Sequence, residues 1–149
     1  RDFPGSHFIR QVWTEFWLWR FPVPFPSRQP GFTWRIAPAV KQQKFVSSPA
    51  IAPGYLYLGD TSGRFYSKEI VKGTTVWEFN TGVPISKSPL IVGDTVYFGT
   101  KLGDFYALNT KTGNLNWALS LHSPMAANPT YGEGRILVRT EDGLLTAIE

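Results

Sequence analysis

Residues from position 47 to the C-terminus repeat with a period of 40 residues, and this period is the strongest constraint on the fold. Both turn-forming and bulky residues recur in one register. The recurring residues are Pro49, Pro89 and Pro129; Gly63, Gly103 and Gly143; Tyr57 and Tyr97; and Trp77 and Trp117. A fixed period of this length, filled with short strands, is typical of β-propeller blades.

The second repeat, residues 86–123, shows the plan of one unit. Apolar runs at 88–92, 95–99, 105–108 and 114–119 are separated by turns rich in Gly, Asp and Asn, which predicts a four-stranded antiparallel meander. The first repeat, 47–85, keeps this plan, and the third, 124–149, stops before a fourth strand. We therefore predict an all-β fold, a partial propeller of about three blades over residues 33–149.

The turn before the fourth strand carries a family resemblance. Residues 107–117 read A-L-N-T-K-T-G-N-L-N-W, which resembles the A-x-D-x-x-T-G-x-x-x-W signature of the pyrroloquinoline-quinone (PQQ)-type propeller repeat. Residues 97–106 match its preceding Y-x-G-x…G-x-x-Y half. Asn109 replaces the usual Asp, and the first repeat departs from the pattern at residues 67–69. The resemblance extends over residues 34–149.

The resemblance implies a role for one tryptophan in each unit. In the PQQ-type family, the tryptophan of each outer strand docks onto the next blade, which would give this role to Trp34, Trp77 and Trp117. Residues 34–36 precede Pro49 much as Trp77 precedes Pro89, so we expect an outer strand there with no blade before it.

Two complete blades and parts of another leave sheet faces and edges open, and such edges promote aggregation. One alternative is that the chain, which begins with Arg and shows no signal peptide, is a mature product or a piece of a longer propeller. Another is that it pairs with a second copy, six blades being a common propeller size. The third is an open three-blade wedge covered by a larger complex.

Residues 1–32 form a different kind of sequence, an arm with nine Phe and Trp and five Pro. Residues 7–20 fit an amphipathic helix, which ends at Pro22 because the residue before proline avoids helical geometry. The residues predicted to bind a membrane or a partner are Phe8, Val12, Trp13, Phe16, Trp17 and Trp19.

Charge also distinguishes the arm from the repeats. Residues 1–46 carry a net charge of +5 and residues 47–149 a net charge of −1. A basic, tryptophan-rich amphipathic helix suits the surface of an anionic membrane. The alternative is that its apolar face packs on protein. Scattered basic residues beside slightly acidic repeats do not favour nucleic-acid binding.

Catalytic or metal-binding patterns do not appear in the sequence. The chain has no cysteine, and its two histidines, His7 and His122, lie far apart without a paired carboxylate. Asp60, Asp104 and Asp142 recur beside the turn between the second and third predicted strands of each unit. A carboxylate in such a turn commonly caps backbone amides. We therefore predict no enzyme activity and no cofactor, with PQQ and calcium as the alternative.

The PQQ-type family includes both quinone-dependent dehydrogenases and scaffolds such as the outer-membrane barrel-assembly lipoprotein. With no catalytic pattern, we predict a non-catalytic assembly subunit in which the repeats bind other protein subunits and the arm anchors to a membrane surface or a large complex. The resemblance implies a periplasmic or extracytoplasmic, membrane-associated location. The alternative is a fragment of a PQQ-dependent dehydrogenase.

Overall fold

A computed structural model describes residue 31 and residues 33–149. The chain divides into two units, Arg1–Phe32 and Thr33–Glu149, and the description below concerns the second. The predicted helix over residues 7–20 and the rest of the arm, Phe8 to Trp19 included, lie outside the described residues. The described part contains strands and no helix.

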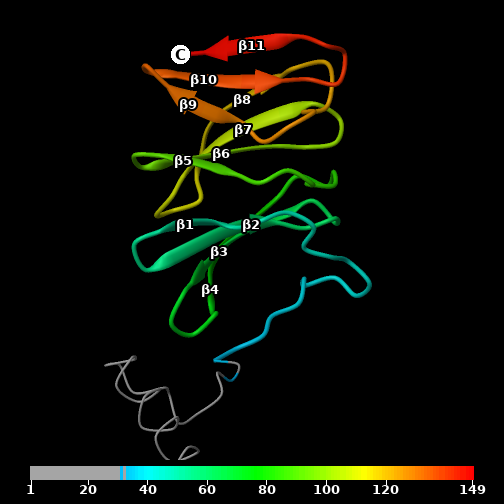
Figure 1. The fold of residues 1–149 in the computed structure, drawn as a ribbon. Coiled ribbons are helices and arrows are strands. Elements are labelled where there is room, and N and C mark those ends of the chain that lie inside the picture. Colours follow the sequence, from blue (N-terminus) through cyan, green and yellow to red (C-terminus); the bar gives the residue numbers. More distant parts are fainter. Residues whose placement is uncertain (1–30, 32) are drawn as a thin grey trace, which may run out of the picture. The chain divides into compact units, whose positions relative to one another are not determined.

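Eleven strands of the described chain form three separate antiparallel sheets, as Figure 1 shows from teal through yellow to red. The first sheet contains β1 (Ala50–Ala52), β2 (Tyr55–Gly59), β3 (Arg64–Glu69) and β4 (Thr75–Asn80). The second contains β5 (Leu90–Val92), β6 (Thr95–Gly99), β7 (Asp104–Asn109) and β8 (Leu115–Ser120). The third contains β9 (Thr130–Gly132), β10 (Arg135–Arg139) and β11 (Leu145–Ile148).

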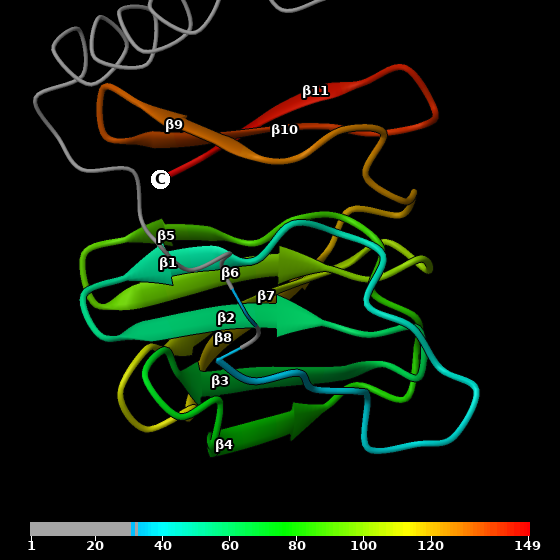
Figure 2. The same cartoon turned by 60° about the horizontal axis from the view of Figure 1, so that its bottom comes forward.

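Strands that are neighbours in sequence are neighbours in each sheet, which gives the predicted meander. The first strands of successive sheets also lie beside each other, β1 next to β5 and β5 next to β9 (Figure 2). The prediction of a partial propeller with four-stranded blades is confirmed, and the third sheet lacks a fourth strand among the described residues.

The strand expected at residues 34–36 is not present as a paired strand. No strand is assigned between residue 33 and the start of β1. A strand is defined by hydrogen bonds to a neighbouring strand, and the described chain offers none beside these residues. The outer strand expected there, with no blade before it, is therefore not formed as a paired strand within the described chain.

Glycine is required where the second and third strands of each sheet meet. Gly63 and Gly103 have φ values of 96° and 91°, which side chains with a Cβ rarely adopt. A Cβ on Gly63 would also lie 2.5 Å from the backbone nitrogen of Val83, and one on Gly103 2.7 Å from the carbonyl oxygen of Ser123. These glycines therefore let each turn pack against the connection that leads to the next sheet.

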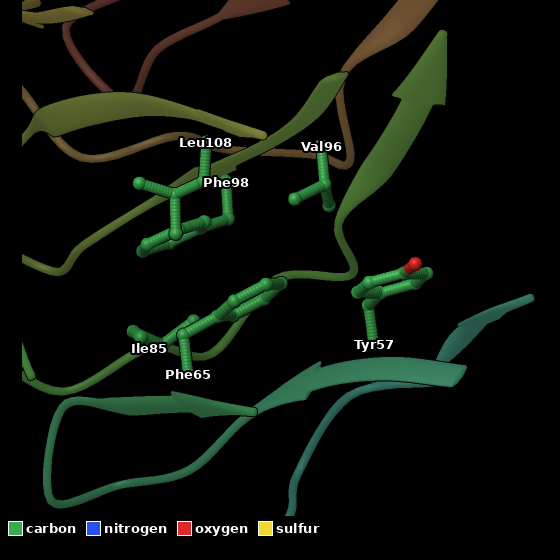
Figure 3. Packing of buried hydrophobic residues seen from close by; sticks show 6 residues of the cluster. All are labelled: Tyr57, Phe65, Ile85, Val96, Phe98 and Leu108. Atoms are coloured by element: carbon green, nitrogen blue, oxygen red, sulfur yellow. The ribbon is translucent and has the colours of Figure 1, made fainter. Parts of the chain in front are cut away.

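Apolar side chains fill the space between adjacent sheets. Figure 3 shows Tyr57 and Phe65 of the first sheet facing Val96, Phe98 and Leu108 of the second. The rings of Phe65 and Phe98 stack with centroids 4.1 Å apart. Phe105 of the second sheet packs in the same way with Ile136 and Val138 of the third. The fold is thus a series of sheets joined by buried apolar faces.

Candidate functional site

Trp77 reaches from β4 of the first sheet to the β7–β8 turn of the second. Its indole Nε1 donates a hydrogen bond of 2.9 Å to the carbonyl oxygen of Thr110. Its ring lies so close to Gly113 that a Cβ there would be 2.6 Å from Trp77 Cδ2. On its own sheet it contacts the rings of Tyr57 and Phe65, each at a centroid distance of 6.0 Å. One side chain therefore links two sheets.

Trp34 makes the corresponding contacts with the first sheet. Its Nε1 donates to the carbonyl oxygen of Ile70 at 2.7 Å, and a Cβ on Gly73 would lie 2.8 Å from Trp34 Cδ2. Ile70 and Gly73 precede Thr110 and Gly113 by 40 residues. Trp34 thus contacts the β3–β4 turn as Trp77 contacts the β7–β8 turn.

Trp117 makes the contacts within its own sheet but none with a following turn of the described chain. Its ring contacts Tyr97 and Phe105, at 5.8 and 6.0 Å, as Trp77 contacts Tyr57 and Phe65. Its Nε1 makes no hydrogen bond to any described residue. Trp77 and Trp117 are both half-buried rather than fully buried.

The β7–β8 turn, which contacts Trp77, is capped by Asn109, the residue that differs from the PQQ-type signature. The side-chain oxygen of Asn109 accepts hydrogen bonds from the backbone nitrogens of Lys111 and Thr112, at 2.9 and 3.1 Å. An amide oxygen therefore caps this turn in place of a carboxylate.

A cavity of about 260 Å³ opens between the second and third sheets. Its walls come from the β6–β7 and β10–β11 turns and from the two connections between sheets, so all of them lie at one end of the strands. Its charged side chains are Lys87, Lys101 and Glu141. We call it the rim cavity. Sequence reasoning missed this cavity. An alignment of the turns of successive repeats would have placed its lining residues at the same end of the strands.

The face of the first sheet that points away from the second is covered by residues 33–49 of the same chain. Trp34 and Phe45 pack on Leu56, Leu58 and Tyr66 there. The backbone nitrogen of Ala39 donates to the Tyr66 phenol at 3.1 Å. This sheet face is therefore largely buried within the described chain.

Tyr66 and Asp60 form a buried polar pair on this face. The Tyr66 hydroxyl donates to Asp60 Oδ2 at 2.7 Å, and the other oxygen of Asp60 accepts from the backbone nitrogens of Ser62 and Arg64. Burial, with a smaller contribution from Asp60, raises the pKa of Tyr66 from 10.0 to about 12. Both carboxylate oxygens of Asp60 and the Tyr66 hydroxyl are thus hydrogen-bonded within the described chain.

Lys68 is an unusual residue at a core position. It is 6% exposed, whereas the corresponding residue of the second sheet is Leu108. Its Nζ donates to Thr75 Oγ1 at 2.7 Å and lies 5.0 Å from the centre of the Tyr66 ring. Burial lowers the pKa of its ammonium group. The sequence indicated only that residues 67–69 depart from the repeat, not that this lysine is buried.

A second cavity, of about 300 Å³, lies at the opposite end of the strands, between the first sheet and the β7–β8 turn. Ser67 lines it and replaces the Ala107 of the second sheet. Its hydroxyl is buried and makes no hydrogen bond to the described residues.

The three recurring aspartates occupy three different positions of their turns. Asp60 caps its turn and is fully buried. Asp142 accepts from Thr140 and from the backbone nitrogen of Leu144, in a capping role of its own. No group of three or more His, Cys, Asp or Glu side chains able to hold a metal ion exists among the described residues. His122 contacts Ser120 on the exposed surface.

Comparison with known proteins gives the family. The family model for outer membrane protein assembly factor BamB matches residues 18–117 and 71–149. The chain belongs to this family. The predicted resemblance to the PQQ-type repeat is thereby confirmed. Among curated proteins, no sequence matches the chain significantly.

Solved structures show the same fold. BamB from Moraxella catarrhalis is 25% identical, with a TM-score of 0.59 over 67% of this chain and 32% of that one. Quinohemoprotein alcohol dehydrogenases from Pseudomonas putida HK5 and Comamonas testosteroni, each 15% identical, give TM-scores of 0.60 and 0.61 over 71% and 70% of this chain. These two cover 21% and 19% of the solved chains. The chain thus spans about a third of the BamB structure and about a fifth of the dehydrogenases.

Proposed function

We propose that this chain is a non-catalytic part of a protein-assembly complex at the outer membrane, where its propeller repeats bind other protein subunits on the periplasmic side. The family match and the 25% identity to a BamB structure carry this proposal. The dehydrogenases share only the fold, because their identity is 15%.

The rim cavity is the surface that we assign to partner binding. Concave sites with a few polar groups are common binding sites, and this one brings Lys87 and Lys101 beside the apolar side chain of Met125. Two ammonium groups favour a partner segment that carries a carboxylate. Glu141 on the opposite wall would pair with a basic residue of the same segment.

The N-terminal arm is proposed as the anchor. Its excess of positive charge and its aromatic residues suit either an anionic lipid surface or an apolar protein surface. The described part of the chain contains no helix with the length and hydropathy needed to cross a membrane.

Co-purification of the outer-membrane assembly subunits from the native host tests the proposal. Charge reversal at the rim cavity, in the double variant Lys87→Glu/Lys101→Glu, should reduce recovery of these subunits about tenfold or more, since each lost charged contact costs roughly 1 to 3 kcal/mol. Deletion of residues 1–32 should release the folded repeats from the membrane fraction.

The matched control is Lys72→Glu/Lys111→Glu, which makes the same change of charge on exposed turns at the opposite end of the strands. It should leave recovery unchanged. Equal losses for the two double variants would indicate a general charge effect and would count against the rim cavity. Recovery of no assembly subunit with the wild-type chain would refute the proposed function.

A piece of a quinoprotein dehydrogenase is the second candidate, favoured by the shared fold. The calcium ion of such an enzyme requires several oxygen ligands. The rim cavity contains one carboxylate, Glu141. The rim cavity therefore does not supply the ligands of a calcium–quinone centre. A change in the absorption spectrum of PQQ on titration with the chain and calcium would support this candidate instead.

A further inference from the structure

The second cavity, between the first sheet and the β7–β8 turn, contains a buried hydroxyl group without a hydrogen-bond partner. Ser67 is 1% exposed, and its Oγ makes no hydrogen bond to a described residue. The neighbouring Tyr57 hydroxyl donates instead to the carbonyl oxygen of Thr110, at 3.2 Å. Trp77 Nε1 donates to the same oxygen at 2.9 Å, so both lone pairs of this acceptor are used. A buried hydroxyl without a partner costs free energy, and a ligand in the cavity can supply that partner.

The register of the first sheet turns the Ser67 side chain toward this cavity. Ser67 lies opposite Tyr57 on one side and opposite Trp77 on the other, and opposite residues of paired strands share a face of the sheet. Tyr57 points from this face toward the second sheet (Figure 3). In the second sheet, Ala107 lies between the equivalent tyrosine and tryptophan. The inward hydroxyl is therefore a property of the first sheet and not of the repeat.

The walls of the second cavity are largely apolar. Tyr55 and Tyr57 line it from alternate positions of β2, so they lie on the same face. A β-bulge beside Ser67 leaves Val76 of β4 without a paired residue, and Val76 lines the cavity as well. The volume of about 300 Å³ is about twice the roughly 150 Å³ of a cavity that holds one benzene ring. The cavity therefore has room for one aromatic ring with substituents.

A positive charge lies at the mouth of the second cavity. Lys111 lines the cavity and is exposed, and its ammonium group makes no ion pair with a described residue. None of the described residues that line the cavity is acidic. A ligand carboxylate at the mouth would pair with Lys111 while an apolar ring lies inside. The buried Ser67 would then contact a polar group on the far side of that ring.

We propose that the second cavity binds a small aromatic carboxylate with a hydroxyl group opposite the carboxylate. The ring packs against Tyr55, Tyr57 and Val76. The carboxylate pairs with Lys111, and the hydroxyl forms a hydrogen bond with Ser67. The cavity lies at the opposite end of the strands from the rim cavity. This binding site therefore goes beyond the proposed function and does not depend on it.

Titration of the full 149-residue chain with 4-hydroxybenzoate and with benzoate, followed by nuclear magnetic resonance, tests the proposal. Binding of 4-hydroxybenzoate should be saturable, with a dissociation constant of about 1 mM or lower. The backbone amide signals of Ser67, Thr110 and Lys111 should shift. Benzoate lacks the hydroxyl group and should bind about fivefold more weakly, which is the effect of one hydrogen bond.

Two variants assign the two polar contacts. Ser67→Ala introduces the residue that the second sheet has at this position, so the variant should fold. It should weaken binding of 4-hydroxybenzoate about fivefold and leave binding of benzoate unchanged. Lys111→Ala should weaken binding of both probes about threefold, because an exposed ion pair is partly screened by solvent. The matched control is Lys72→Ala, at an exposed lysine of the β3–β4 turn, which should change neither affinity.

Three results would overturn the proposal. The first is no binding of either probe at about 10 mM, ten times the expected dissociation constant. The second is a set of shifted signals that lies outside the second cavity. The third is an equal loss of affinity for both probes in Ser67→Ala, because this would indicate altered packing and not a lost hydrogen bond. None of these results bears on the recovery of assembly subunits, which tests the proposed function.

Discussion

Replacing Trp77 or Trp117 by alanine measures how much each tryptophan contributes to the free energy of unfolding. Comparing the two losses separates the contact with the turn of the next sheet from packing within the tryptophan's own sheet. Both residues contact two aromatic rings of their own sheet at nearly equal distances, 6.0 and 6.0 Å for Trp77 and 5.8 and 6.0 Å for Trp117. Only Trp77 also makes a hydrogen bond to the next sheet and packs on a glycine there. The chain thus provides its own control.

The magnitudes follow from these contacts. Truncating a large, fully buried aromatic costs about 3 to 5 kcal/mol, and because Trp77 is half-buried we expect the lower end of this range, about 3 kcal/mol, for Trp77→Ala. The hydrogen bond to Thr110 contributes about 1 kcal/mol, and the contact with Gly113 adds dispersion energy. Trp117→Ala should therefore reduce the free energy of unfolding by about 1 to 2 kcal/mol less than Trp77→Ala does.

Urea unfolding followed by circular dichroism measures both losses without depending on the fluorescence of the replaced tryptophan. The slope of stability against urea should stay constant, since a changed slope would indicate that the extent of unfolding had changed. Equal losses for the two variants, or a loss below about 1 kcal/mol for Trp77→Ala, would show that contact with the following turn does not stabilise the fold.

Two further predictions concern Gly113 and Tyr66. Gly113→Ala should destabilise more than Gly93→Ala in the same urea assay, because both glycines have positive φ but only at Gly113 would the new Cβ meet the ring of Trp77; similar losses would mean that backbone strain alone accounts for the effect. For Tyr66, the pKa is about 12 in the folded chain and 10.0 in the unfolded chain. Its contribution to stability is complete below pH 10.0 and is lost as pH rises toward about 12, because only the unfolded chain then releases the proton. Tyr66→Phe should weaken this alkaline loss of stability, and an unchanged pH profile would contradict the buried pair with Asp60.

The 40-residue period predicted the sheets well because each unit contains its own strands and turns. The β2–β3 turn, for example, requires Gly63 at positive φ, and the same glycine recurs in the later units. Local patterns of this kind need no knowledge of the neighbouring sheets.

Features that depend on contact between distant segments were not predicted. Trp77 and Trp117 look equivalent in sequence, but their environments differ. Only Trp77 contacts a described turn, and that turn lies more than 30 residues further along the chain. The burial of Lys68 depends on residues 33–49, which cover its sheet face. The rim cavity combines four connections that are separated in sequence. Such properties follow from how the sheets pack.

Hydrogen exchange of the indole N–H groups, followed by nuclear magnetic resonance, tests most directly whether each tryptophan docks on the turn of the following sheet. The indole N–H groups of Trp34 and Trp77 donate to partly buried backbone carbonyl oxygens, whereas that of Trp117 has no acceptor among the described residues. We predict slow exchange for Trp34 and Trp77 and fast exchange for Trp117. Fast exchange at Trp77, or equal protection of Trp77 and Trp117, would contradict this account.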